Sequence, residues 1–148
     1  MPASSPLIVC LVDDDPSVRK SLTRLLDSAG FATHAFADAK AFLDHLATHH
    51  VPVAILDIWM ERMTGMELLA HLCARSPDTR VIFITAHEDR AAKAIVMRAG
   101  AFDFFIKPFD PNCFLDAIGR AFAGAAALAD RGGLPGRKAP GRRETEVQ

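Results

Sequence analysis

Three carboxylates, one hydroxyl and one ammonium group stand where apolar segments of this sequence end. Asp13 and Asp14 directly follow the apolar run LIVCLV (7–12), and Asp57 follows the apolar run VAIL (53–56). Two like unit charges about 4 Å apart repel by roughly 4 kcal/mol at an effective dielectric near 20. Clustered carboxylates therefore either share a proton or bind a cation.

The hydroxyl and the ammonium group complete a set suited to phosphoryl chemistry. Thr85 ends the segment RVIFIT, and Lys107 follows FDFFI. An aspartate is a nucleophile toward phosphoryl groups, and Mg²⁺ takes one or two carboxylates together with phosphate oxygens. A metal, a lysine and a hydroxyl can stabilise charge on the transferring group. The acids after the first apolar run are predicted metal ligands, which leaves Asp57 to receive phosphate.

Apolar and amphipathic segments alternate five times along the chain. The pattern predicts strands at 7–12, 31–36, 53–56, 80–85 and 102–106. It predicts helices after Asp15-Pro16, after Asp38, over 66–74, over 90–99 and from Asp110-Pro111 to about Phe122. Asp15 is the expected N-cap of the first helix. The alternation indicates an α/β fold, a doubly wound parallel sheet with helices on both faces. The strand at 31–36 is less apolar, which favours a place nearer the edge.

Composition and charge indicate a globular protein and give no support for a nucleic-acid-binding, membrane or secreted protein. The chain has 148 residues, 50% hydrophobic and 24% charged, which suits one globular domain. A net charge of −1 gives no argument for nucleic acid or an acidic membrane. No apolar run approaches the ~20 residues of a membrane span, and the start lacks a signal peptide's basic region. Three separated cysteines without a CxxC motif favour a cytoplasmic setting, with Cys10 in the core.

The ordered motifs VDDD, LDIWMERMTGMELL, FITAH and IKPF resemble the receiver domains of two-component response regulators, over 7–122. The flanks DPSVRKSL, AGF and RAGAFDFFIKPF are most similar to the nitrogen-fixation-type (FixJ-like) subgroup. The resemblance implies a flavodoxin-like sheet of order 2-1-3-4-5 with five helices. It also implies a Mg²⁺ or Mn²⁺ ion, a sensor histidine kinase as partner and no membrane. The implied role is that of a phosphorylation-dependent switch rather than an enzyme, with transcription as its output.

The resemblance also assigns the acidic residues. Asp57 is the implied phospho-acceptor, which attacks the phosphohistidine of the kinase. Asp14 is the implied direct ligand of the ion, and Asp13 acts mainly through water. Asp57 itself and the main-chain carbonyl of Trp59 are the remaining expected protein ligands.

The other implied roles concern the response to phosphate. Thr85 and Lys107 are expected to contact phosphoryl oxygens, and the family pattern puts a cis peptide before Pro108. Phe104 matches an aromatic switch that turns inward when Thr85 moves. The face formed by 90–122 is then the expected surface for a homodimer or another partner, with Met97, Arg98 and Phe104 as contact residues.

Three further residues bear on the rate of the reaction. Trp59 and His87 stand two residues after Asp57 and Thr85, at positions that in this family tune the lifetime of the phosphate. Glu61 stands where the family usually has proline. This departure bears on the phosphorylation rate and the metal affinity, but not on the fold.

Two alternatives remain open from the residues alone. DDDPS nearly matches a haloacid-dehalogenase-type phosphohydrolase motif with Asp13 as nucleophile and Asp15 as acid, but no acid pair follows Lys107 and Asp57 has no role. A pseudo-receiver that binds without being phosphorylated also remains, because of Glu61. An FMN-binding carrier fails, because its phosphate would face three acids.

The remaining polar features are interpreted as surface. His45 and His49 are four residues apart with His50 adjacent, and no cysteine or acid completes a zinc-like set. They are therefore predicted to lie on a solvated helix face. Residues 1–6 are a predicted disordered N-terminus. Residues 123–148 are predicted as the end of the last helix plus a basic Gly/Pro-rich linker or tail. Its segment RRETEV resembles the start of a helix-turn-helix output domain. Contact with DNA is expected only through such an output domain.

Overall fold

The computed structural model describes residues 7–130, in which five strands alternate with five helices. The strands are β1 (Ile8–Val12), β2 (Ala32–Phe36), β3 (Val53–Asp57), β4 (Arg80–Thr85) and β5 (Asp103–Ile106). The helices are α1 (Pro16–Ser28), α2 (Ala39–Leu46), α3 (Gly65–Arg75), α4 (Arg90–Arg98) and α5 (Pro111–Asp130). The predicted N-terminal segment 1–6 and the predicted tail from 131 onward lie outside the described residues.

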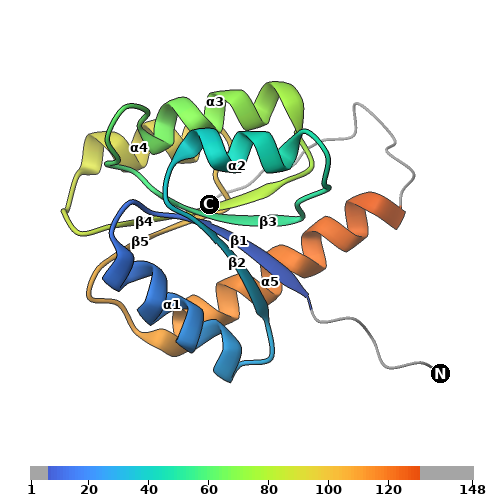
Figure 1. Cartoon of the computed structure of the whole chain (residues 1–148), viewed down its shortest axis with the longest axis horizontal. Coiled ribbons are helices and arrows are strands. Elements are labelled where there is room, and N and C mark those ends of the chain that lie inside the picture. The colour runs from blue at the N-terminus through green and yellow to red at the C-terminus, as the bar shows by residue number, and fades with distance from the viewer. Residues whose placement is uncertain (1–6, 131–148) are drawn as a thin grey trace.

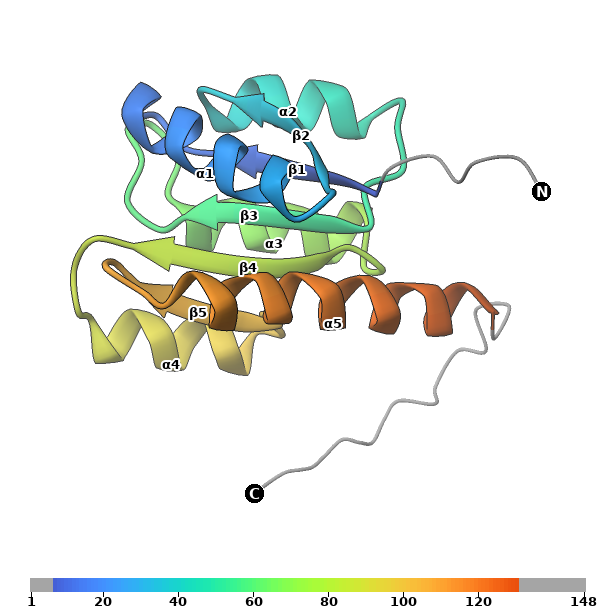
Figure 2. The same ribbon diagram turned by 90° about the horizontal axis from the view of Figure 1, so that it is seen from below.

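The five strands form one parallel sheet in the order β2-β1-β3-β4-β5, as expected. Figure 2 shows their arrowheads pointing in the same direction, so their carboxyl ends share one edge of the sheet. The weakly apolar strand β2 is an edge strand, which confirms its predicted position. Helices α2, α3 and α4 cover one face of the sheet, and α1 and α5 cover the other (Figure 1).

The core consists of two layers, one on each face of the sheet. One layer packs β-strand residues such as Leu56 and Phe83 against α2, α3 and α4, and contains the buried Cys10. The other packs residues such as Ile55 against α1 and α5, with Phe114 fully buried. Every residue of β3 is buried, because a central strand with helices on both faces has no solvated side.

The helix starts agree with the capping residues expected from the sequence. Asp15 accepts a hydrogen bond from the Ser17 N–H at 2.9 Å, and Asp38 accepts one from the Ala41 N–H at 2.8 Å. Helix α5 continues to Asp130, beyond the end near Phe122 that the sequence pattern predicts. Within residues 7–130, no helix is both long enough and apolar enough to cross a membrane.

The histidines at 45, 49 and 50 do not form the single solvated helix face that was expected. His45 is in α2 and half-buried, whereas His49 and His50 follow the end of the helix and are exposed. Its ring contacts that of His34 on β2, with centroids 4.5 Å apart, and that of Phe36 at 5.2 Å. The sequence pattern missed this contact because it joins two elements.

Candidate functional site

The carboxyl ends of β1, β3, β4 and β5 surround a small cavity of about 160 Å³. Strand ends of a parallel sheet meet at one edge, which is where ligands bind in such folds. The structure brings seven predicted site residues together around this cavity: Asp13, Asp14, Asp57, Trp59, Thr85, His87 and Lys107. Phe104 does not line it; this side chain is buried on β5, with the Lys93 ammonium 6.0 Å from its ring centroid.

The three acids are arranged as a candidate cation site. One carboxylate oxygen from each of Asp13, Asp14 and Asp57 lies within 4.8 Å of the others. Asp13 is buried, and its Oδ1 accepts a hydrogen bond from the Asp15 N–H at 2.9 Å. Its Oδ2 is buried without a hydrogen-bond partner in the described chain, and the nearest cation, Lys107 Nζ, is 4.0 Å away. A buried carboxylate oxygen left in this state fits a hard cation such as Mg²⁺.

Burial and repulsion perturb the acids of the cavity. Burial, followed by the charge of Asp13, raises the pKa of Asp57 from 3.8 to about 6. The Trp59 N–H, 3.3 Å from Asp57 Oδ1, and the Lys107 ammonium act in the opposite direction. Burial also raises the pKa of Asp13. Ionising Asp13 or Asp57 without a bound cation therefore costs free energy, and this cost favours the binding of an ion at this site.

Hydrogen bonds from backbone N–H groups hold Thr85 and Lys107, which carry the hydroxyl and the ammonium group, at the rim of the cavity. The Lys107 N–H donates to the Thr85 carbonyl oxygen at 2.8 Å, which ties the end of β5 to the end of β4. The Thr85 hydroxyl oxygen accepts from the His87 N–H at 3.2 Å. The peptide bond between Lys107 and Pro108 is cis, as the resemblance implied.

The main-chain N–H of Glu61 makes a hydrogen bond that proline, the usual residue of the family at this position, is unable to make. This N–H donates to Asp14 Oδ2 at 3.2 Å. Proline has no N–H, so this bond depends on the departure from the family pattern. It connects the loop after β3 to a metal-ligand candidate from β1, and the next residue, Arg62, has a φ of 71°.

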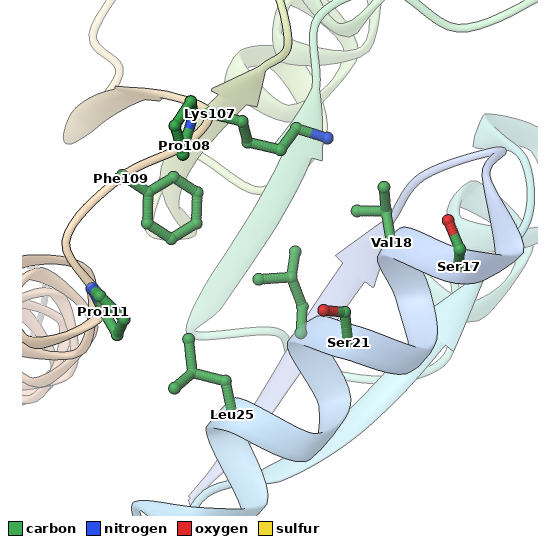
Figure 3. Close-up of a pocket in the computed structure, with 9 residues that line it drawn as sticks. Ser17, Val18, Ser21, Leu25, Lys107, Pro108, Phe109 and Pro111 are labelled. Atoms are coloured by element: carbon green, nitrogen blue, oxygen red, sulfur yellow. The ribbon is translucent and has the colours of Figure 1, made fainter.

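A second, larger cavity of about 640 Å³ adjoins the first and was not foreseen from the sequence. Figure 3 shows it between α1 and the loop that follows β5, with Phe109 and Pro111 on one side and Leu25 on the other. Val18 and Lys107 line both cavities. Sequence patterns identify α1 as amphipathic but do not place this loop beside it.

Residues 9–119 match the response regulator receiver domain family, well over half of the chain. The chain belongs to the response regulator receiver domain family. The acidic triad Asp13, Asp14 and Asp57 in the cavity is consistent with the metal site of a receiver. Receivers act as signalling switches rather than classical enzymes, and this assignment gives no support to the phosphohydrolase alternative.

Relatives of this receiver are transcriptional regulators. It is 39% identical over 131 residues to the transcriptional regulatory protein FixJ of Azorhizobium caulinodans, covering 88% of this chain and 61% of that protein. This chain is 41% identical over 114 residues to the C4-dicarboxylate transport transcriptional regulatory protein DctD of Pseudomonas aeruginosa, and the match covers 76% of this chain and 24% of DctD. The crystal structure of FixJ-N superposes on this chain with a TM-score of 0.73 and 36% sequence identity, and the match covers 81% of this chain and 96% of FixJ-N. The receiver thus spans less than two thirds of either full-length regulator.

Proposed function

We propose that this receiver is a phosphorylation-dependent switch of a two-component system in which Asp57 accepts a phosphoryl group from a sensor histidine kinase. In this step a carboxylate oxygen of Asp57 forms a bond to phosphorus while the histidine N–P bond breaks. The observation that carries the proposal is the shared cavity, in which Asp57 faces two further acids, a hydroxyl and a lysine. The regulators to which it is similar suggest transcription as the output.

We propose that three aspartates and one main-chain carbonyl of the acidic cavity bind a divalent metal ion. Asp13, Asp14, Asp57 and the Trp59 main-chain carbonyl would hold Mg²⁺ or Mn²⁺, with Asp14 as a direct ligand and Asp13 acting mainly through water. The bound ion supplies positive charge beside the transferring phosphoryl group. The orphaned Asp13 Oδ2 and the raised pKa of Asp57 both support this assignment.

Thr85 and Lys107 are the proposed contacts of the phosphoryl oxygens. The Thr85 hydroxyl would donate one hydrogen bond, and the Lys107 ammonium would pair with another oxygen. Trp59 and His87 line the same cavity, and we propose that they shield the acyl phosphate from water. Three free cysteines, Cys10, Cys73 and Cys113, agree with a reducing cytoplasmic setting.

The proposed output surface is the α4–β5–α5 face. A shift of Thr85 toward phosphate would free space beside β4, and Phe104 on the neighbouring strand β5, which is already buried here, would move further into that space. Ile95 and Met97 expose 56% and 38% of their surface on α4, although both are large apolar residues. Exposed apolar side chains mark interaction surfaces, and we propose a homodimer of phosphorylated receivers through this face.

We assign the larger cavity of Figure 3 to the kinase. A phosphohistidine must come within bonding distance of Asp57, so the kinase surface has to cover the rim of the acidic cavity. The adjoining cavity shares Val18 and Lys107 with that rim and offers apolar walls from Leu25 and Phe109. Apolar burial next to the reacting group would orient the partner.

Intact-mass spectrometry after incubation with acetyl phosphate and Mg²⁺ tests the function. We expect one phosphoryl group per chain, lost in Asp57→Asn and under EDTA but retained in Asp15→Asn, whose side chain caps α1. The decay of the adduct in Trp59→Ala and His87→Ala tests the shielding role. No adduct with any divalent ion would indicate a pseudo-receiver, and an adduct lost only in Asp13→Asn would indicate the phosphohydrolase.

Metal affinity provides a second prediction. Trp59 is the only tryptophan and lines the acidic cavity, so its fluorescence should report Mg²⁺ binding. Asp14→Asn is expected to weaken binding roughly 10–100-fold, because a hard cation loses a charged oxygen ligand. Asp27→Asn, which changes an exposed acid of α1 away from the cavity, is the matched control and should bind as the wild type does. Equal affinity in Asp14→Asn would remove Asp14 from the metal site.

A further inference from the structure

Each of the three carboxylates in the acidic cavity accepts a hydrogen bond from a main-chain N–H. Asp13 and Asp57 accept theirs from the residue two positions further along the chain, at 2.9 Å and 3.3 Å. These two donors are therefore local and come with the path of each strand end. Asp14 instead accepts from Glu61, which is 47 residues away in the sequence. The third bond thus joins two separate segments of the chain.

Asp14 also differs from the other two acids in its burial. Asp13 and Asp57 are buried, whereas Asp14 is exposed and borders both the acidic cavity and a further cavity of about 220 Å³. Within residues 7–130, the bond from the Glu61 N–H is the only hydrogen bond to the Asp14 side chain. An exposed side chain loses rotamer freedom when it is held in one orientation. The orientation of the Asp14 carboxylate therefore depends on Glu61.

The donor lies in the loop between β3 and α3, which also carries a proposed ligand of the ion. Trp59, whose main-chain carbonyl has that role, stands two residues before Glu61. The far end of the loop is held by the Gly65 N–H, which donates to the Ile58 carbonyl oxygen at 2.7 Å. The bond from Glu61 to Asp14 therefore restrains two proposed ligands, one after β1 and one after β3, relative to each other.

A strained turn directly follows the donor. The Met63 N–H donates to the Glu61 carbonyl oxygen at 2.7 Å, and Arg62 between them has a φ of 71°. A bond over two residues with positive φ at the centre is a γ-turn of the rare, strained kind. Such a backbone persists only where its surroundings hold it in place. Proline would restrict φ at position 61, and in this chain the bond to Asp14 holds that residue instead.

We propose that the main-chain N–H of Glu61 is a positioning group of the metal site, which orients the Asp14 carboxylate and links order in the loop after β3 to ion binding. The inference rests on the proposed metal site, in which Asp14 is a direct ligand. With Oδ2 bonded to the loop, Oδ1 is the oxygen that faces the ion. Hydrogen bonds to ligating carboxylates orient them and support metal affinity. The role belongs to the backbone, so the Glu61 side chain is replaceable.

Two changes at position 61 separate the N–H from the side chain. Glu61→Ala keeps the N–H, and its Mg²⁺ affinity, measured by Trp59 fluorescence, should stay within about threefold of the wild type because an exposed charge is screened. Lactic acid incorporated at position 61 has the side chain of alanine but an ester oxygen in place of the N–H. Its Mg²⁺ affinity should be about 10-fold weaker than that of Glu61→Ala. Glu61→Pro also removes the N–H but restricts φ, so the ester is the sharper test.

Amide hydrogen exchange in EDTA tests the hydrogen bond itself, without metal or phosphorylation. The Glu61 N–H should exchange about 10-fold faster in Asp14→Ala, which has no acceptor oxygen, than in the wild type. The Ala41 N–H is the matched control, because it donates to the exposed carboxylate of Asp38 at 2.8 Å and should exchange alike in both proteins. Equal exchange of the Glu61 N–H in both proteins would overturn the proposal.

The Mg²⁺ titrations distinguish failure of this inference from failure of the proposed metal site. If the wild type binds Mg²⁺ and the ester binds as tightly as Glu61→Ala, the N–H has no positioning role, although the metal site stands. A loss of thermal stability in the ester without a loss of affinity would likewise reduce the bond to a structural contact and overturn the proposal. A wild type that binds no Mg²⁺ would refute the metal site, and the positioning role with it.

Discussion

Asp57→Asn is expected to make the metal-free protein more stable than the wild type by about 2–3 kcal/mol at about pH 7.5. The carboxylate is buried, and its pKa is raised from 3.8 to about 6 by burial and by the charge of Asp13. Ionisation therefore costs free energy in the folded state that it does not cost in the unfolded state. Asparagine keeps the shape of the side chain and removes that charge.

The sign of the pH dependence follows from the raised pKa. The folded protein binds the Asp57 proton more tightly than the unfolded chain, so protonation at this residue stabilises the fold. This contribution is present below about pH 4, declines as the pH rises to about 6 and is absent above that range. The difference in free energy of unfolding between Asp57→Asn and the wild type should accordingly vanish at about pH 3.5.

Urea unfolding followed by circular dichroism in EDTA, across this pH range, measures the effect. Asp27→Asn changes an exposed acid of α1, and its free energy of unfolding should differ from that of the wild type by no more than about 0.5 kcal/mol. Added Mg²⁺ should reduce the advantage of Asp57→Asn, because the ion stabilises the charged carboxylate of the wild type. Equal stabilities of variant and wild type at neutral pH in EDTA would contradict the raised pKa.

The residues around the acidic cavity were predictable because each one ends or follows an apolar segment. Asp57 closes the fully buried β3 and Thr85 closes β4, so the strand pattern alone assigns both to one edge of the sheet. The order of the strands came from the resemblance, since alternation of strands and helices does not determine which strands are neighbours. The positions of Asp13 and Lys107 in the same cavity depend on that order.

Contacts between elements were not predictable in the same way. His34 stands on a weakly apolar edge strand, where the sequence gives no sign that its ring meets His45 across the gap to α2. The bond from the Glu61 N–H to Asp14 depends on the path of a loop that no periodicity describes. Sequence patterns report the buried side of each element, and these contacts form at edges and in loops.

Gly65→Ala is expected to destabilise the protein by about 2–4 kcal/mol. Gly65 is the first residue of α3, and its N–H donates to the Ile58 carbonyl oxygen at 2.7 Å. This bond brings it against the end of β3. A β-carbon at position 65 would overlap the Asp57 carbonyl oxygen and lie 2.9 Å from Phe83 Cε1 and 3.0 Å from Ile58 Cα. Two of these neighbours are backbone atoms, so the strand itself has to move.

The same displacement should impair phosphorylation, because the backbone that must move carries the proposed phospho-acceptor. We expect the rate of adduct formation with acetyl phosphate to fall roughly 10–100-fold, as misplacing a reacting group by about 1 Å does in enzymes. Gly119→Ala is the matched control: nothing lies within 4 Å of its β-carbon position in α5, and alanine there should stabilise the helix by about 0.5–1 kcal/mol. If both alanine variants were stabilised alike, helix propensity would outweigh the contact at Gly65, and the close approach of α3 to Asp57 would not constrain the site.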